Sequence, residues 1–426
     1  SLDDNGEPVQ AVNVGDSFTM LVEDIDDIEA VKPTLVRPFN FYDDRLFHIR
    51  LLRDKEHYYL LLDIHHIIGD YMSLRVMLSD VESVYKGKSL SPEILTMAEL
   101  AIAESELRKT EAFEEGKKWY AENFDCGDCF TQLLPDREDK EHAEDSMLRI
   151  LGVDMADVDK FCRAGGISQS TFFTSAYSFL LAKYNNEQQS LFTTINNGRS
   201  RRFLRSVGMT VRTLPIYAKF DNDTTVINFL RAGEEQMNGC KKHEAYAFSD
   251  VMHDLGLQYN SMFAWHGKLF ASEEFCGKPM TTIRLSNSTL EQSLYLKTFI
   301  LNGQCHVKAE YNSNEYSESL IAQYLESYEA VVSEFLTKEY LRDIAIATSP
   351  QVELLDGFNQ TDVDYDTTQT IVSLFRQQAK ATPDQIAVVF KDKSYTYKEV
   401  DEISDRLAGN IALRGLRLKA KLKLQL

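Results

Sequence analysis

Hydrophobic positions gather in one short run early in the chain and then recur at helical spacing. Residues Tyr58–Ile64 form a nearly continuous apolar run, which is typical of a strand buried on both faces. A helix is predicted next, with Ser73 as its N-terminal cap and Gly87 as the left-handed residue that ends it. The apolar stripe of this helix consists of Leu74, Met77, Leu78, Val81, Val84 and Tyr85. The segment His65–Met72 therefore connects a strand to a helix.

Helix and strand patterns alternate further along the chain. Ser170 begins a second predicted helix, and a strand is expected at Ser190–Ile195. Within Thr298–Val307, the dipeptide Asn302-Gly303 predicts a hairpin, because both residues tolerate the positive φ angles of a type I′ turn. A long amphipathic helix is expected over 321–335. This alternation predicts an α/β fold.

The pattern changes after Ser349-Pro350. A polar connector, Gly357–Asp362, is typical of a domain boundary. A new unit is predicted from about Thr370, with a helix over 371–379, strands over 386–390 and 394–397, and a helix over 400–407. So short a unit is marginal for a hydrophobic core of its own.

Charge and composition exclude several classes of partner. The chain has 66 acidic and 46 basic residues and a net charge of -20, so it would repel the phosphate backbone of a nucleic acid. No run approaches the roughly 18 apolar residues that a membrane helix needs, and the first residues lack the pattern of a signal peptide. We therefore expect a cytoplasmic protein that binds neither nucleic acid nor membrane.

The six cysteines are too sparse for a disulfide scaffold in a chain of 426 residues. Cys126 and Cys129 have the spacing of half a zinc site or of a redox pair, but neither a second such pair nor a closely spaced histidine pair completes a site. We expect reduced thiols and no bound metal.

The segment His65-His66-x-x-x-Asp70 carries the most informative chemistry. Two imidazoles at a strand end and a carboxylate near a helix start place a base and an anchoring acid where side chains commonly face a cleft. A metal site is a second interpretation, although adjacent histidines on an extended backbone point to opposite faces. Purely structural histidines are a third. Spacing alone leaves all three open.

Several motifs in order resemble one family. Leu61–Leu74 looks like the HHxxxDG signature of condensation domains in nonribosomal peptide synthetases. Asn197–Ser200 and Val207–Pro215 resemble the GR...VGMFVNTLP segment of that family, and His243–Asp250 is similar to its HQDLPFE-like segment. Ala309–Asn312 matches the last strand, usually written EYN.

The end of the chain extends this resemblance. Leu354–Thr361 resembles the linker LLxxFNxT that leads into an adenylation domain, and Tyr395–Val400 resembles the opening TYxEL motif of that domain. The domains implied are the remainder of an N-terminal condensation lobe (1–108), a C-terminal condensation lobe (109–348), a linker (349–368) and the first part of an adenylation domain (369–426).

The resemblance implies an α/β fold of the α+β sandwich type, with two chloramphenicol-acetyltransferase-like lobes in a V and a tunnel between them. It implies an acyltransferase that joins an acyl or peptidyl thioester to an aminoacyl thioester through an amide bond. Peptidyl carrier protein domains would be the partners and would supply both phosphopantetheine arms, so that no cofactor binds this chain directly. The implied catalytic residues are His66, His65 and Asp70. Of these, His66 would hydrogen-bond the attacking amine, His65 would support the loop, and Asp70 would fix the loop geometry.

The chain also departs from the family pattern. Tyr71 stands at the position of the signature glycine, Arg212 at that of an asparagine and Ala247 at that of a proline. Tyr71, Arg212 and Arg199 are expected beside the substrate tunnel. The family normally has a further segment before the first residue of this chain, so the first lobe is expected to be incomplete and to lack an arginine that would pair with Asp70. The last residues, 416–426, also depart from the family.

Two other functions fit these features. A catalytically impaired carrier-docking module is one, because the Tyr71 ring could obstruct the tunnel. An epimerisation-type relative, which shares the histidine motif, is the other, although the adenylation-like segment argues against it.

Overall fold

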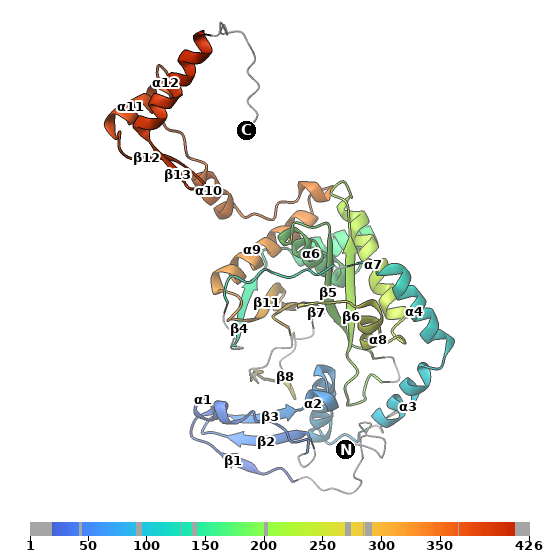
Figure 1. Cartoon of the computed structure of the whole chain (residues 1–426). Coiled ribbons are helices and arrows are strands. Elements are labelled where there is room, and N and C mark those ends of the chain that lie inside the picture. The colour runs from blue at the N-terminus through green and yellow to red at the C-terminus, as the bar shows by residue number, and fades with distance from the viewer. Residues whose placement is uncertain are drawn as a thin grey trace. The chain divides into compact units, whose positions relative to one another are not determined.

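The computed structural model describes residues 19–41, 45–90, 96–127, 129–138, 143–199, 203–268, 274–283, 285, 292–364 and 366–413. The chain divides into two compact units, Ser1–Gln351 and Val352–Leu426 (Figure 1). Both lobes expected from the sequence, 1–108 and 109–348, fall within the first unit. Asp128, Ser200 and the divergent end at 416–426 lie outside the described residues.

A small three-stranded sheet comes first. Its strands lie in the order β1 (Val22–Asp24), β2 (Phe47–Arg53) and β3 (Tyr58–Ile64). β1 is parallel to β2, and β2 is antiparallel to β3. The strand predicted at Tyr58–Ile64 is confirmed, but the prediction that it is buried on both faces is wrong. β3 is the last strand of this sheet in the described part of the chain, and none of its residues is fully buried.

The helix after this sheet, α2 (Tyr71–Tyr85), begins at a different cap from the one predicted. Asp70 is the N-terminal cap, because its side chain accepts a hydrogen bond of 2.8 Å from the backbone N–H of Ser73. Ser73 closes the reciprocal half of the capping box through its own hydroxyl, which accepts from the Asp70 N–H. Gly87, with φ of 73°, follows the end of the helix as predicted.

A six-stranded mixed sheet forms the centre of the rest of this unit. Its strands lie in the order β4, β11, β10, β7, β5 and β6. Their bounds are β4 (Glu144–Ile150), β5 (Gln189–Asn196), β6 (Arg212–Lys219), β7 (Ser261–Gly267), β10 (Leu294–Leu301) and β11 (Gln304–Asn312). The predicted hairpin is confirmed as β10–β11, with φ of 50° at Asn302 and 80° at Gly303. A two-stranded piece, β8 (Glu274–Phe275) and β9 (Lys278–Pro279), lies outside this sheet.

Helices α6, α7 and α9 pack on this sheet and build the main core (Figure 1). α6 (Gln169–Tyr184) is buried from Thr171 to Ala182, and its cap is Ser168 rather than the predicted start at Ser170. The long helix expected over 321–335 is α9 (Glu318–Phe335). The remaining helices of the unit are α1 (Ile28–Val31), α3 (Met97–Leu107), α4 (Glu111–Asn123), α5 (Met155–Gly165), α7 (Val226–Lys242) and α8 (Phe248–Leu255), with 3-10 turns η1 (Lys32–Thr34), η2 (His66–Ile68) and η3 (Leu341–Asp343). The mixed α/β fold agrees with the sequence.

The second unit is small. The helix α10 (Ser349–Phe358) occupies the first half of the segment expected to be a linker. α11 (Ile371–Ala381), the hairpin β12 (Ile386–Phe390) with β13 (Lys393–Thr396), and α12 (Tyr397–Leu413) follow. These elements match the helix, strand, strand and helix predicted from the sequence.

Candidate functional site

The two adjacent histidines lie in the short loop between β3 and α2. His65 has an extended backbone and caps η2, because its Nδ1 accepts a hydrogen bond of 3.1 Å from the backbone N–H of Ile67. The ring of His65 meets the ring of Phe41 edge-on, with centroids 4.7 Å apart. The side chain of His65 is therefore engaged in holding the loop.

His66 is exposed, and among the residues that the structure describes only one of its ring nitrogens has a hydrogen-bond partner. Its Nδ1 lies 3.0 Å from the backbone oxygen of Gly69. A carbonyl oxygen can only accept, so Nδ1 must carry the proton that is donated. In the neutral ring, Nε2 then has a free lone pair, which is the state that a proton acceptor needs.

Asp70 anchors this loop from a fully buried position. Its Oδ1 accepts from the Ser73 N–H (2.8 Å) and from Arg199 (2.7 Å), and its Oδ2 accepts from the Thr210 hydroxyl (2.9 Å). Burial raises the pKa of the Asp70 carboxyl, but the hydrogen bonds from Ser73, Arg199 and Thr210 outweigh it and hold the pKa below its ordinary value. Asp70 is therefore a charged structural anchor rather than an exposed acid.

Arg199 is the partner of Asp70, which corrects one expectation. The sequence predicted that this partner would come from a segment before this chain, whereas Arg199 donates to Asp70 with both side chains fully buried. The same guanidinium donates to the backbone oxygens of Phe203 (3.0 Å) and Ser206 (2.5 Å). Arg199 was also expected beside a substrate tunnel; in the structure its side chain is fully buried and bonded to protein acceptors.

Tyr71 occupies the first position of α2, where an ordinary helical backbone is adopted. A glycine is not required there by the backbone. Close packing occurs instead at Gly69, where an added Cβ would lie 3.3 Å from the Ile64 side chain and 3.5 Å from Ser73. The ring of Tyr71 is partly buried.

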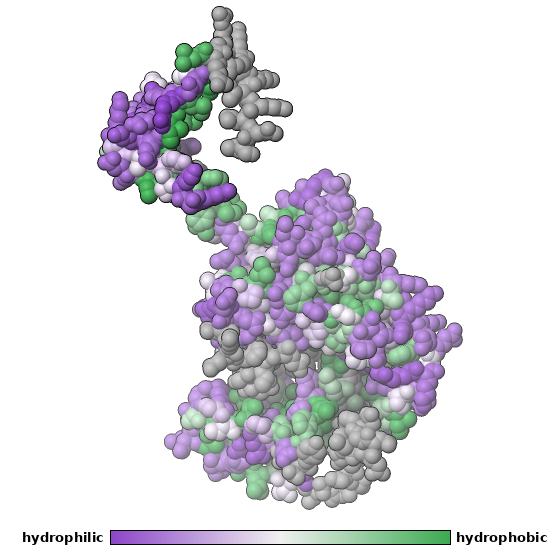
Figure 2. All heavy atoms as spheres, in the orientation of Figure 1, coloured by the Kyte–Doolittle hydropathy of each residue, from purple (hydrophilic) through white to green (hydrophobic). Residues whose placement is uncertain are grey.

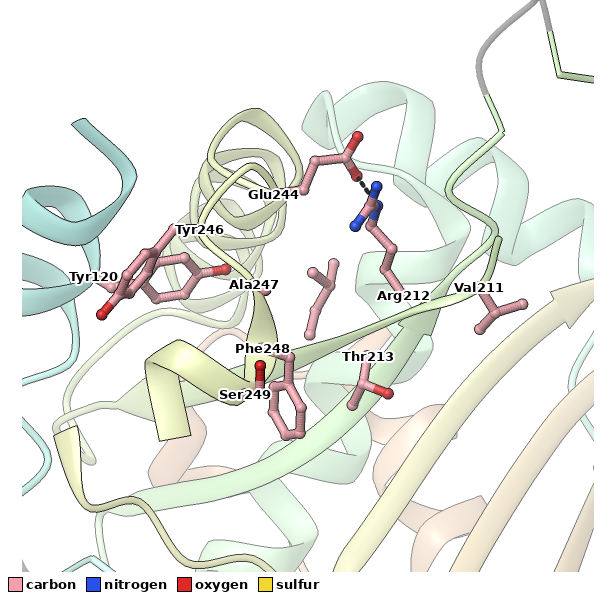
Figure 3. Close-up of a pocket in the computed structure, with 10 residues that line it drawn as sticks. Tyr120, Val211, Arg212, Thr213, Glu244, Tyr246, Ala247, Phe248 and Ser249 are labelled. Carbon is pink, nitrogen blue, oxygen red and sulfur yellow. Dashed lines mark ion pairs between the residues drawn. The ribbon is translucent and has the colours of Figure 1, made fainter. Parts of the chain in front are cut away.

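Arg212 lines a pocket of about 240 Å³ in the first unit (Figure 3). Its guanidinium lies between two carboxylates and pairs with Glu104 (2.5 Å) and with Glu244 (3.8 Å). Ala247, another departure from the family pattern, is also at this pocket. The lining residues are Tyr120, Val211, Arg212, Thr213, Leu214, Glu244, Tyr246, Ala247, Phe248 and Ser249. The two motif segments that contain Arg212 and Ala247 are thus brought together in space.

The thiols of Cys126 and Cys129 are buried and form no disulfide. Burial raises the pKa of both thiols, to about 11 for Cys129, so they are protonated at neutral pH. Among the residues that the structure describes, no cluster of three or more histidine, cysteine or acidic side chains is arranged to hold a metal ion.

Sequence reasoning missed two functional contacts of this region. Thr210 lies inside the VGMTVRTLP segment, so its place in the motif was the available signal for a bond to Asp70. Glu104 had no such signal, because it lies in an ordinary polar stretch of α3 and meets Arg212 only through the fold.

The site is thus a histidine loop anchored by a buried carboxylate. The chain belongs to the condensation domain family, whose model matches residues 1–351. Its relatives include tyrocidine synthase 3 of Brevibacillus parabrevis, 24% identical over 97% of this chain and 7% of that protein. The chain thus spans less than a tenth of the length of this relative.

Two solved structures share the fold. The nonribosomal peptide synthetase FmoA3 matches with a TM-score of 0.72 and 16% identity over 94% of this chain and 45% of that one. The epimerization domain from the third module of tyrocidine synthetase B matches with a TM-score of 0.63 and 15% identity over 76% of this chain and 81% of that one. None of the described helices is long and apolar enough to span a membrane.

Proposed function

We propose that this chain forms amide bonds in nonribosomal peptide synthesis, between an acyl or peptidyl thioester and the amine of an aminoacyl thioester. The observation that carries the proposal is the exposed ring of His66, with Nδ1 bonded to the Gly69 oxygen and Nε2 open to a substrate. The membership of the condensation domain family supports it.

In the proposed reaction, the amine nitrogen bonds to the thioester carbonyl carbon and gives up a proton to Nε2 of His66. The carbon–sulfur bond then breaks, and the leaving thiolate takes that proton. His65 and Asp70 do not touch the reacting atoms. They fix the loop, so that the His66 ring is already oriented when substrates arrive.

General-base catalysis by His66 and the positioning of the two substrates both contribute to the rate of amide formation, and the sizes of the two contributions differ. A general base supplies on the order of 10²- to 10⁴-fold. Holding two tethered substrates together can be worth roughly 7 to 11 kcal/mol by itself. Loss of His66 is therefore expected to slow the reaction without abolishing it.

The substrates are proposed to arrive on carrier protein domains, whose phosphopantetheine arms reach a tunnel between the two lobes of a V. No cofactor of the chain itself enters this scheme. Arg212 and Tyr71 would lie beside this tunnel. The pocket at Arg212 supports this assignment for Arg212, because both apolar and charged side chains line it.

The test is detection of amide formation by intact mass. The protein is mixed with carrier proteins loaded with N-acetylaminoacyl donors and aminoacyl acceptors drawn from the twenty common amino acids. His66→Ala is expected to lose at least 100-fold in rate. His57→Ala is the matched control, since His57 lies in the turn between β2 and β3 with 64% of its side chain exposed. Equal rates in wild type and His66→Ala would remove His66 from the mechanism.

A carrier-docking module without catalysis is the second candidate, and the partly buried Tyr71 ring next to the anchored loop favours it. Carriers that bind the folded protein while no donor and acceptor pair gives product would support docking. Inversion of a peptidyl thioester in the absence of an acceptor would instead indicate an epimerisation-type enzyme.

We also propose that residues from about 369 onward form the first part of an adenylation domain, with the remainder of that domain as their partner. The second unit, which begins at Val352 and includes part of the linker, leaves many large apolar side chains exposed, and Figure 2 shows hydrophobic surface on this unit. They include Leu354, Leu355, Phe358, Ile371, Val372, Leu374, Val389, Phe390, Leu407 and Leu413. So many exposed apolar groups are expected where another part of the same domain covers them.

A further inference from the structure

His48 lies in the small sheet, outside the His65–Asp70 motif. Its ring is surrounded by side chains that hold it on several sides. It lies on β2 directly opposite Asp63 on β3. Its Nδ1 lies 3.2 Å from Oδ2 of Asp63, and its Nε2 lies 2.9 Å from a terminal nitrogen of Arg37. The His48 and Asp63 side chains are only 15% and 13% exposed.

These contacts decide which nitrogen of the His48 ring donates a hydrogen bond and which accepts one. A guanidinium can only donate, so Nε2 of His48 accepts from Arg37, and Nδ1–H donates to the Asp63 carboxylate. The Arg37 Nε, 3.5 Å from Nδ1, is too distant to compete with Asp63 for that nitrogen. The His48 ring is thus held in one orientation from both sides.

An aromatic contact connects His48 to the histidine loop. Phe39 stacks on the His48 ring, with centroids 4.5 Å apart and planes inclined by 15°. The same Phe39 meets the ring of His65 edge-on at 5.8 Å. His65 in turn caps the turn that carries His66.

We propose that His48 is a positioning residue for the condensation reaction: its ring holds Phe39 against His65, and His65 thereby keeps the loop that presents His66 in its active geometry. This inference rests on the function proposed above. His48 does not touch substrate, and its effect passes through Phe39 and His65. Removing the His48 ring leaves Phe39 without its stacking partner, so that His65 is held only by its contacts with Phe41 and the Ile67 N–H.

The experiment compares three variants of the whole chain. His48→Ala removes the ring, His48→Phe retains a flat ring for Phe39 but bonds neither Asp63 nor Arg37, and His57→Ala is the control histidine, in the turn between β2 and β3. Two quantities are measured, the kcat and KM of amide formation with the carrier-bound substrates above, and the ring ¹⁵N signals of His65 in histidine-labelled protein. In wild type, the Nδ1 signal of His65 should be that of an unprotonated nitrogen, because Nδ1 accepts from Ile67.

We expect His48→Ala to lower kcat about tenfold at unchanged KM and to mix the two tautomers of His65. His48→Phe should restore kcat to within about threefold and restore the His65 signals. A His48→Ala variant with wild-type kcat and wild-type His65 signals overturns the proposal, as does a His48→Phe variant as impaired as His48→Ala. If His48→Ala fails to fold, Phe39→Leu takes its place with the same expectation. A wild-type protein that forms no amide overturns the proposed function, whereas the nitrogen signals still decide whether His48 holds His65.

Discussion

The guanidinium of Arg199 lies 2.7 Å from the carboxylate of Asp70, although 129 residues separate them in sequence and neither side chain is exposed. The pair joins the start of α2 to the segment between β5 and β6. Thr210 and Ser73 complete the hydrogen bonds of the carboxylate. The loop that carries His66 is therefore fixed both by α2, which follows it, and by the distant segment between β5 and β6.

Removing one partner of this pair should be costly, because it leaves a buried charge without compensation. Arg199→Met is expected to lower the free energy of unfolding by about 3–5 kcal/mol, measured by urea unfolding. Arg205→Met is the matched control, since Arg205 pairs with Asp80 of α2 at the surface and should change the stability by less than about 1 kcal/mol. Equal losses in both variants would contradict the anchoring role of Arg199.

Acid should weaken the fold through Asp70. Because its pKa is lower in the folded protein than its ordinary value of 3.8, the charged carboxylate contributes stability that is fully present above this value and is lost as the pH falls through the lower, folded pKa. Wild type should therefore lose stability more steeply below about pH 4 than Asp70→Asn does. The measurement is the urea midpoint of both proteins from pH 6 downward. Parallel curves would show that the carboxylate does not carry this dependence.

Gly198 should tolerate no side chain, because it has φ of 60° and an added Cβ would lie 1.9 Å from the backbone oxygen of Thr210. Gly166, at the end of α5, has φ of 71° but open space around it. Gly166→Ala isolates the cost of the backbone conformation, about 1–2 kcal/mol. Gly198→Ala should cost about 1–3 kcal/mol more, because the backbone at Thr210 must move. Similar unfolding energies for the two variants would refute the close approach at Thr210.

Tyr71→Gly restores the glycine of the family signature and tests whether the Tyr71 ring affects stability or the rate of amide formation. Since Tyr71 begins a helix with ordinary backbone angles, the glycine variant should lose about 0.5–1 kcal/mol of stability. We expect the rate of amide formation to stay within about threefold of wild type. An increase of more than tenfold would show instead that the ring fills the path of the substrate.

Local patterns in the sequence were enough to predict the secondary structure around the site. The strand Tyr58–Ile64, the turn at Asn302-Gly303 and the helix α9 follow from apolar spacing and turn chemistry, which act over a few residues. The cap of α2 was placed three residues late, because both Asp70 and Ser73 are good caps and only the fold shows which side chain meets the first turn.

Partners that are distant in sequence could not be predicted. The bond from Arg199 to Asp70 and the ion pair from Arg212 to Glu104 join segments more than 100 residues apart, and no local pattern encodes them. The stacking of Phe39 on His48 was not predicted either, because neither residue belongs to a motif. Conversely, His66 was found because its neighbours in the loop are also its neighbours in sequence.

The span between Asp70 and Arg199 also sets an order of events during synthesis. At about 5–20 residues per second, a ribosome needs roughly 6 to 26 s to add the 129 residues that separate them. During that interval the nascent chain already contains both histidines of the loop, but the Asp70 carboxylate still lacks its guanidinium. The loop can adopt its final conformation only when the segment after β5 has emerged from the ribosome. The loop is therefore synthesised before this segment but folds together with it.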